Sequence, residues 1–124
     1  MLSLEAKVGE SDKVELFAVR NDGNRISISG MSEGTRDSLF LSLRLASLEE
    51  RIVRTPPLPL ILDDVLIHLD DRRTGFALAA LADFSANAQV VLFTHHRHIV
   101  DLAESAIPGR FQKMEMQGSS VVSV

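Results

Sequence analysis

The chain has 124 residues, of which 45% are hydrophobic and 24% are charged, as in an ordinary globular domain. A net charge of −4 argues against binding to a nucleic-acid backbone over the whole surface, although a local basic patch could still contact DNA. No apolar run reaches the length of a membrane span, there is no cysteine for a disulfide or thiolate metal site, and the first residues lack an export pattern, so we expect a cytoplasmic protein without a membrane partner.

The first predicted element is a β-hairpin over residues 14–29. Apolar residues alternate with polar ones on both sides of the turn sequence Asn21-Asp22-Gly23-Asn24, which is the pattern of two antiparallel strands joined by a tight connection. Residues 1–13 are polar and weakly patterned. We expect them to be a linker stub, with one domain over residues 14–124.

A long helix is predicted from about Glu33 to Arg54. Ser32 is its expected N-cap, and Pro56-Pro57 end it. Four apolar residues recur at helical spacing and should form one buried stripe: Leu41, Leu45, Leu48 and Ile52.

Two strands with a helix between them follow. Residues 58–63 show no polar alternation, which predicts a strand covered by helices on both faces of a parallel sheet. Asp70 or Asp71 can cap the next helix, whose buried face holds Leu78, Leu81 and Phe84. Gln89 to Thr94 forms the second strand. This order predicts a β-α-β unit with a right-handed crossover.

The C-terminal part is predicted to hold a helix and two closing strands. The helix carries Ile99, Leu102 and Ala103 and stops before Pro108-Gly109. Residues 111–116 and 120–124 are the strands, with Gly118 between them. The fold class is therefore α/β, with a mainly parallel sheet flanked by helices.

Acidic residues and histidines follow the two predicted parallel strands. Asp63 and Asp64 end the first, and Thr94-His95-His96 ends the second. Because parallel strands present their carboxyl ends at one sheet edge, these residues should meet there, where Asp63 could hold Mg²⁺ and Asp64 could polarise a water. The simpler interpretation is that two acids after a strand only cap a helix or line a loop.

A loop rich in serine and glycine enters the first helix, with the sequence Met31-Ser32-Glu33-Gly34-Thr35. Backbone N–H groups at a helix start attract phosphate. The simpler interpretation is that Ser32 caps the helix and Gly34 is incidental. Glu33 supports it, since its carboxylate would repel an anion.

The histidine cluster has three interpretations. His95, at the strand end, could hydrogen-bond a terminal phosphate or its attacking water. Alternatively, the imidazoles and nearby carboxylates could bind zinc or a catalytic transition metal. In the third interpretation His96 and His98 are solvated residues in the first turn of a helix, which we favour for these two.

Taken together, the ordered motifs MSEGTRDSLFLSLRLASLE, LILDDVLIHLD and VVLFTHH resemble the C-terminal lobe of an ABC-type ATPase head of the SMC and SbcC kind, and most closely the YhaN-like bacterial DNA-repair ATPases. The resemblance covers about residues 25–104, and the joint order of the motifs is more specific than any one of them. It implies a P-loop NTPase-like half-domain.

The resemblance also implies a role for individual residues. Residues 31–35 match the ABC signature loop, so Ser32, Gly34 and Thr35 would contact, in trans, the nucleotide of a second head. Residues 60–63 match the Walker B strand with Asp63 on Mg²⁺, and Asp64 matches the catalytic acid. Leu69 and Asp70 match the D-loop at the dimer interface, and His95 matches the switch histidine.

Two positions depart from that family's motifs. Asp64 stands where the family has Glu, so its carboxylate is one methylene shorter and hydrolysis could be slow. Glu33 stands where most ABC signatures have Gly, which puts close phosphate contact in doubt, although the YhaN-like group shares this acidic variant.

The sequence contains no G-x-x-x-x-G-K-[ST] loop, whose amides and lysine cradle the phosphates of ATP. We therefore expect ATP and Mg²⁺ to bind only with an N-terminal Walker A lobe from the same or another polypeptide. The resemblance further implies a second head as partner, and indirect action on DNA.

Two alternatives from other classes remain open. One is a self-contained metal-dependent phosphohydrolase or nuclease with Asp63, Asp64, Asp70, His95 and His98 as ligands. The other is a non-catalytic interaction module that only dimerises, because an uncovered apolar sheet edge favours assembly.

Overall fold

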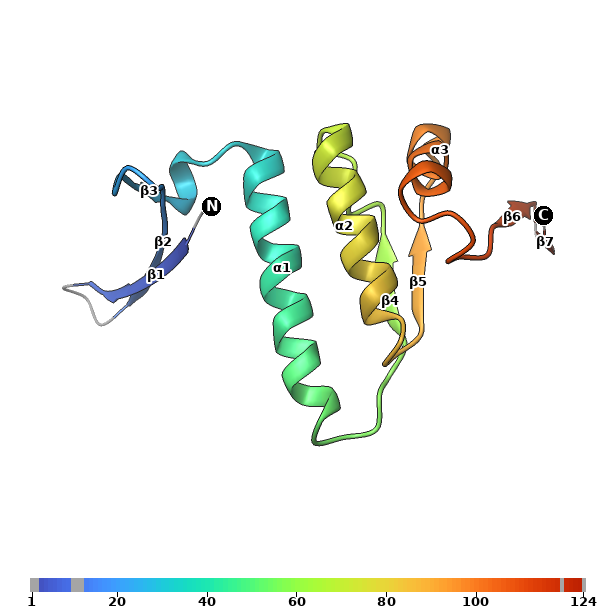
Figure 1. The fold of residues 1–124 in the computed structure, drawn as a ribbon, viewed down its shortest axis with the longest axis horizontal. Coiled ribbons are helices and arrows are strands. Elements are labelled where there is room, and N and C mark those ends of the chain that lie inside the picture. Colours follow the sequence, from blue (N-terminus) through green and yellow to red (C-terminus); the bar gives the residue numbers. More distant parts are fainter. Residues whose placement is uncertain (1–2, 10–12, 119, 124) are drawn as a thin grey trace. The chain divides into compact units, whose positions relative to one another are not determined.

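A computed structural model describes residues 3–9, 13–118 and 120–123, which divide between two compact units, residues 1–36 and 37–124 (Figure 1). The first unit holds the N-terminal strands. The second holds the parallel strands, most of the long helix and the C-terminal elements. No helix among the described residues is long and apolar enough to cross a membrane.

The first unit is a three-stranded antiparallel sheet in the order β1-β2-β3, followed by a short 3-10 helix. Arg20 N–H donates to Asn24 O at 2.9 Å, and Gly23, with φ 81°, completes the turn between β2 and β3. The predicted hairpin is confirmed. Its elements are β1 (Ser3–Val8), β2 (Val14–Val19), β3 (Arg25–Ser27) and the 3-10 helix (Ile28–Gly30).

Residues 1–13 were expected to be a linker stub, but Ser3–Val8 within them forms a strand that pairs with β2 along its whole length. Glu5 on β1 accepts two hydrogen bonds from the Arg25 guanidinium on β3, at 2.7 and 3.0 Å. The signal for β1 was present but short: Leu4, Ala6 and Val8 alternate with Glu5 and Lys7, as in a strand with one polar face. The domain boundary at residue 13 stays a prediction.

The second unit is built on two parallel strands, β4 (Leu60–Asp63) and β5 (Val90–Phe93), paired in register from Leu60↔Val90 to Asp63↔Phe93. The predicted β-α-β order is confirmed. The helices and the C-terminal strands are α1 (Glu33–Ile52), α2 (Asp71–Phe84), α3 (Arg97–Ala106), β6 (Met114–Gln117) and β7 (Ser120–Ser123).

The core of this unit lies on one face of the parallel pair. Leu60 and Leu62 of β4 pack with Leu81 and Phe84 of α2 and with Leu45 of α1. The predicted stripe on α1 is confirmed, since the other three of its members pack against the same cluster: Leu41, Leu48 and Ile52. A second cluster joins α2 to α3 and includes Leu66, Leu78, Ile99 and Ala103. Burial of these side chains fixes the two strands against the helices.

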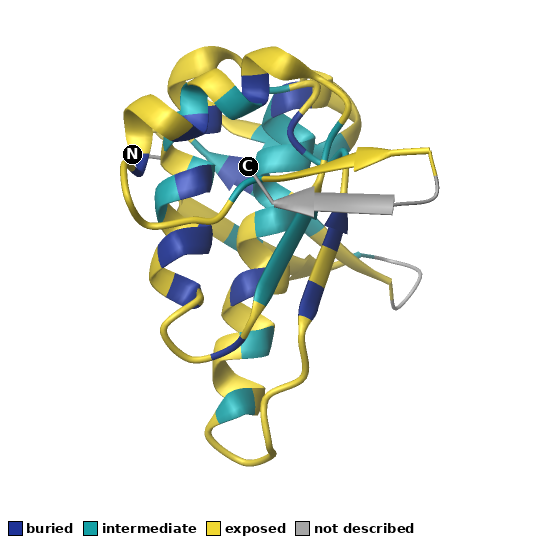
Figure 2. Cartoon of the chain, turned by 90° about the vertical axis from the view of Figure 1, so that its right-hand side faces the viewer, coloured by how far each residue is buried: buried dark blue, intermediate teal, exposed yellow. Residues whose placement is uncertain are grey.

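The expectation that helices cover both faces of the first strand is wrong. Buried and exposed residues alternate along β4 (Figure 2), and Ile61 is 65% exposed. On β5, Phe93 is 43% exposed. An unbroken apolar run has the same sequence whether one face or two are covered within the chain, so sequence could not distinguish them. One face of this pair is therefore available to a further element.

The expected mainly parallel sheet is also limited, among the described residues, to the pair β4 and β5. The N-terminal strands form an antiparallel sheet, and β6 and β7 form a separate antiparallel pair around Gly118; two closing strands were predicted there, but the first begins at Met114 rather than at residue 111. Residue 124, part of the last predicted strand, lies outside the described residues.

Candidate functional site

The carboxyl ends of β4 and β5 lie side by side, and this register brings their following residues together. Asp63 is paired with Phe93, and the next peptide, Asp64 N–H, donates to Phe93 O at 2.9 Å. Asp64 has a positive φ of 51°, which a non-glycine residue adopts uncommonly and Asp tolerates better than most. This turn directs the Asp64 side chain toward the residues after β5.

Asp64 is the centre of the site. Its Oδ2 lies 2.6 Å from His95 Nδ1, and its Oδ1 accepts a hydrogen bond from the Thr94 hydroxyl at 2.9 Å. The Asp64 side chain is 20% exposed, whereas that of His95 is 79% exposed. A part-buried carboxylate held at both oxygens, beside an imidazole open to solvent, can position a water and exchange a proton with it. The predicted meeting of Asp64 and His95 is confirmed.

His96 also faces Asp64, although the interpretation favoured for it was a solvated residue in the first turn of a helix. Its Nε2 lies 3.9 Å from Asp64 Oδ2, and its ring centroid lies 4.2 Å from that of His95. It is the N-cap residue of α3, and its backbone N–H donates to the Thr94 hydroxyl at 3.2 Å. Thr94 was expected at this sheet edge, but its contact with Asp64 was not predicted. The sequence signal for this contact was a hydroxyl residue placed between the end of the strand and the two histidines.

Asp63 differs from Asp64 in its surroundings. It is exposed at the last position of β4, on the same face as Ile61, because alternate residues of a strand share a face. Within the described residues no hydrogen bond or ion pair engages its carboxylate. Exposed carboxylate oxygens are ligands that Mg²⁺ accepts. The two acids are thus neighbours in sequence with different neighbours in space.

The helix entry at residues 31–35 lies in the first unit. Ser32 is the N-cap predicted for α1: its Oγ accepts from Thr35 N–H at 3.3 Å and lies 2.9 Å from Thr35 Oγ1. Gly34 is buried in the first turn, and Glu33 supplies the acidic residue favoured near the positive end of a helix dipole. The capping interpretation accounts for these contacts, and the predicted phosphate contact stays a prediction.

The turn between β4 and α2 holds the residues matched to the D-loop. Leu69 packs against the α2–α3 cluster, and its N–H donates to Leu66 O at 3.2 Å. Asp70 Oδ1 accepts from Arg73 N–H at 2.8 Å, so Asp70 is the N-cap of α2, as the sequence predicted. His68 Nδ1 lies 2.7 Å from Asp37 Oδ2 on α1. The turn is therefore anchored to helices at both ends.

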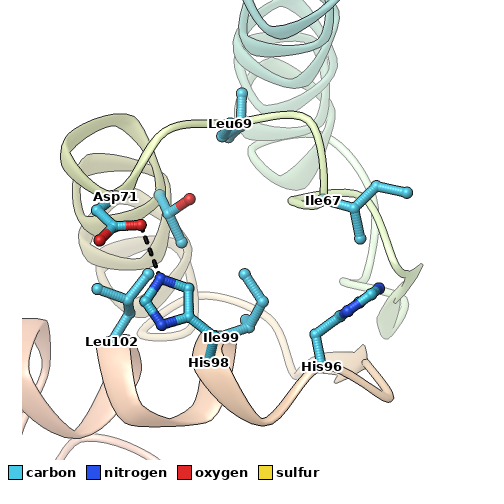
Figure 3. A pocket seen from close by; sticks show the side chains of 8 residues that line it. Ile67, Leu69, Asp71, His96, His98, Ile99 and Leu102 are labelled. Atoms are coloured by element: carbon cyan, nitrogen blue, oxygen red, sulfur yellow. Dashed lines mark hydrogen bonds and ion pairs between the residues drawn. The ribbon is translucent and has the colours of Figure 1, made fainter.

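A further aspartate–histidine pair joins the first turns of α2 and α3. His98 Nε2 lies 2.7 Å from Asp71 Oδ1, and that hydrogen bond raises the pKa of His98 above its usual value. Figure 3 shows the pair at one side of a small pocket, of about 120 Å³, walled mainly by Ile67, Leu69, Ile99 and Leu102. His98 was expected to be a solvated helix residue, and this partner was missed.

The alternative metal set of the sequence analysis is not brought together. Asp70 caps α2 and His98 pairs with Asp71. Among the described residues, one group has ligand atoms that all lie within 4.8 Å of one another, and it consists of Asp64, His95 and His96. Of the five ligands proposed from the sequence, the structure brings two together, Asp64 and His95. His96, which was expected to be a solvated residue, joins them.

Comparison with known proteins places the chain beside DNA-repair ATPases, although no family model matches it. It is 30% identical over 100 residues to the DNA double-strand break repair Rad50 ATPase of Saccharolobus solfataricus, covering 80% of this chain and 11% of that protein. It is also 30% identical over 92 residues to the uncharacterized protein YhaN of Bacillus subtilis, covering 73% of this chain and 9% of YhaN. The chain thus spans about a tenth of the length of these curated relatives.

Two solved structures share the fold. One comes from work on ATP-driven dimerization and DNA-stimulated activation of SMC ATPases, with TM-score 0.73 and 19% identity, covering 99% of this chain and 73% of that chain. The other is the Smc head domain of Pyrococcus furiosus with an extended coiled coil, bound to the C-terminal domain of ScpA, with TM-score 0.66 and 17% identity, covering 99% of this chain and 30% of that one. The resemblance inferred from the motifs is confirmed.

Proposed function

Since this chain is homologous to Rad50 ATPases and YhaN and has the fold of an SMC ATPase head, we propose that it forms the C-terminal half of an ATP-hydrolysing head. The other half would be an N-terminal lobe with the Walker A loop, from the same or another polypeptide. The reaction is phosphoryl transfer from ATP to water. It is the function that the site geometry supports best.

One observation carries the proposal: side chains from the ends of two parallel strands meet at Asp64, whose Oδ2 lies 2.6 Å from His95 Nδ1. Carboxyl ends of parallel strands are where open α/β sheets bind their ligands. In the proposed reaction Asp64 orients the attacking water and accepts its proton, and His95 holds the γ-phosphate or that water. General-base assistance of this kind contributes about 10²–10⁴-fold to a rate.

Thr94 has a positioning role in this proposal. Its hydroxyl donates to Asp64 Oδ1 and accepts from His96 N–H, so it ties the carboxylate to the start of α3. With Oδ1 engaged, Oδ2 is the oxygen that faces the imidazoles and a water. Because Asp64 is one methylene shorter than the Glu of related heads, the fixed carboxylate reaches less far, and we expect slow turnover.

Asp63 would bind Mg²⁺. Its carboxylate is exposed at the end of β4 beside Asp64, and an oxygen donor free of ion pairs among the described residues fits the preference of Mg²⁺ for oxygen ligands. When bound, Mg²⁺ neutralises charge on the phosphate oxygens. Asp63 contributes one ligand, and the remaining ligands would come from the phosphates, water and the other lobe.

The exposed face of β4 and β5 supports the need for a second lobe. Ile61 and Phe93 are large apolar residues, 65% and 43% exposed, on strands whose opposite face packs against the core cluster. Leaving them in water is unfavourable, and clustered apolar exposure marks an interaction surface. We propose that the Walker A lobe covers this face and thereby brings the phosphate cradle to Asp63 and Asp64.

A second head is the other proposed partner. The SMC ATPase of similar fold is described as undergoing ATP-driven dimerization. In this chain Ser32, Gly34 and Thr35 would contact the nucleotide held by the opposite head. Leu69 and Asp70 would lie at the interface between the heads. DNA would be acted on indirectly, through parts of the relatives that this chain does not span.

The test is ATP turnover by the chain alone and after addition of a Walker A lobe, taken from a neighbouring coding sequence or from a related head. We expect no turnover above background by the chain alone and Mg²⁺-dependent phosphate release by the mixture. Robust turnover by the purified chain alone would contradict the proposal. Hydrolysis of phosphodiesters by the chain alone would instead favour the metal-dependent nuclease.

A further inference from the structure

We propose that Asp64, His95 and His96 together bind a divalent transition-metal ion, with Zn²⁺ as the best fit. The site uses His96, which the proposed ATPase reaction does not use. It is distinct from the Mg²⁺ position at Asp63, because its ligands include two imidazoles rather than oxygens alone.

The ligand chemistry selects the metal. Two imidazole nitrogens and one carboxylate oxygen are a donor set that suits Zn²⁺ and neighbouring transition metals, whereas Mg²⁺ prefers oxygen donors alone. Three protein ligands leave the fourth tetrahedral position to a water. The two adjacent carboxylates would therefore bind different ions, Asp63 a Mg²⁺ and Asp64 a Zn²⁺, because the donors beside them differ.

The geometry is close to what such an ion needs. The three donor atoms lie within 4.8 Å of one another, with Asp64 Oδ2 at 2.6 Å from His95 Nδ1 and at 3.9 Å from His96 Nε2. Zinc–nitrogen bonds of about 2.0–2.1 Å in a tetrahedron put donors about 3.3–3.4 Å apart. The first distance must lengthen and the second must shorten by less than an ångström. Both histidines are exposed enough to turn.

The surroundings already hold the ligands in place. Thr94 donates to Asp64 Oδ1, which leaves Oδ2 for the metal, and the same hydroxyl accepts from the backbone of His96. The Asp64 backbone is fixed by its bond to Phe93 O. Partners that orient ligands in this way commonly change metal affinity by about 10–100-fold. Thr94 therefore orients two of the three proposed metal ligands, Asp64 and His96.

His98 provides a matched control within the same helix turn. It is an exposed histidine two residues after His96, but its Nε2 is engaged by Asp71 at 2.7 Å. The site therefore predicts that two neighbouring exposed histidines have unequal effects on metal binding, which an adventitious surface histidine pair would not produce.

The test is titration of the 124-residue chain with Co²⁺ followed by displacement with Zn²⁺. We expect one Co²⁺ per chain, a visible ligand-field spectrum, and loss of that spectrum when one equivalent of Zn²⁺ is added. His96→Ala and Asp64→Asn should each weaken Zn²⁺ binding at least about tenfold, and Thr94→Val by about 10–100-fold. His98→Ala should bind as the wild type does.

Two outcomes overturn the site: equal Zn²⁺ affinity in His96→Ala and wild type, or equal losses in His96→Ala and His98→Ala, each with folding verified by circular dichroism. A consequence that rests on the proposed function is that Zn²⁺ inhibits the completed head, since Asp64 and His95 cannot serve the metal and the water at once. Inhibition should be weaker in His96→Ala. The metal titration needs neither nucleotide nor a second lobe. Its result can therefore be interpreted even if the ATPase proposal fails.

Discussion

Two of the aspartate–histidine pairs in this chain differ in their surroundings although the distances within them are almost equal. At the strand ends, Asp64 and His95 lie 2.6 Å apart; at the helix starts, Asp71 and His98 lie 2.7 Å apart. The Asp64 side chain is 20% exposed and is also bound by Thr94, whereas that of Asp71 is 69% exposed.

The contrast shows that a short aspartate–histidine distance does not by itself mark a reaction centre. What distinguishes the first pair is its place at the carboxyl ends of parallel strands and the partial burial of its carboxylate, both of which favour ligand chemistry. The second pair links the first turns of α2 and α3 at the surface. We therefore assign chemistry to the first and helix anchoring to the second, and four predictions test that assignment.

The largest expected effect is on turnover by the completed head. Asp64→Asn removes the proposed base but keeps the side-chain shape, so phosphate release should fall by about 10²–10⁴-fold. Asp71→Asn, the matched change in the second pair, should stay within about twofold of wild type. Similar losses in the two variants would remove the distinction between the pairs.

The next effect is on stability, along the strand that carries the first pair. Leu62 is 6% exposed in the core cluster, so Leu62→Ala should lower the free energy of unfolding of the chain by about 2–5 kcal/mol. Ile61 is 65% exposed on the opposite face, and Ile61→Ala should change it by no more than about 0.5 kcal/mol. Urea denaturation measures both. Equal losses would show that both faces of β4 are packed in the chain alone.

A smaller effect is expected at the helix start that carries the second pair. Asp70→Ala removes the side-chain bond to Arg73 N–H and should destabilise the chain by about 1 kcal/mol. Asp70→Asn keeps an acceptor at the N-cap and serves as the control, with a change of a few tenths of a kcal/mol. Thermal or urea unfolding distinguishes them. A larger loss in Asp70→Asn than in Asp70→Ala would argue for a charge effect instead.

The smallest effect is a titration. The hydrogen bond from Asp71 raises the pKa of His98, so the pair stabilises the fold fully below the unfolded-state pKa of about 6.5 and loses that contribution as the pH rises through the higher folded-state pKa. In Asp71→Asn the pKa of His98 should move down toward its usual value. Histidine ring shifts in an NMR titration measure it, and an unchanged pKa would exclude Asp71 as the cause.

Sequence was sufficient for most elements because their signals are local. The Asn21–Asn24 turn, the apolar stripe on α1 and the Asp70 cap each depend on neighbouring residues, and each is present in the structure. The convergence of Asp64 and His95 was also predictable, since it follows from the parallel order of two strands.

The predictions that failed depend on tertiary contacts, which neighbouring residues in the sequence do not show. Burial of β4 depends on what packs against Ile61, and an apolar run cannot show whether that partner belongs to the same chain. His96 and His98 are alternate residues in one short segment, and only the tertiary fold shows that the first faces Asp64 and the second faces Asp71. β1 was missed for another reason, because its alternation of Leu4, Ala6 and Val8 with Glu5 and Lys7 is short.

The central claim is that this chain supplies acids and a histidine to a triphosphate whose main cradle lies in another lobe. Calorimetric titration with Mg²⁺ and ATP tests it most directly, with the chain alone and with the chain bound to a Walker A lobe. The account predicts no measurable binding by the chain alone at millimolar ATP, and stoichiometric binding by the complex that exceeds the binding of the isolated lobe. Micromolar ATP affinity in the chain alone would contradict it.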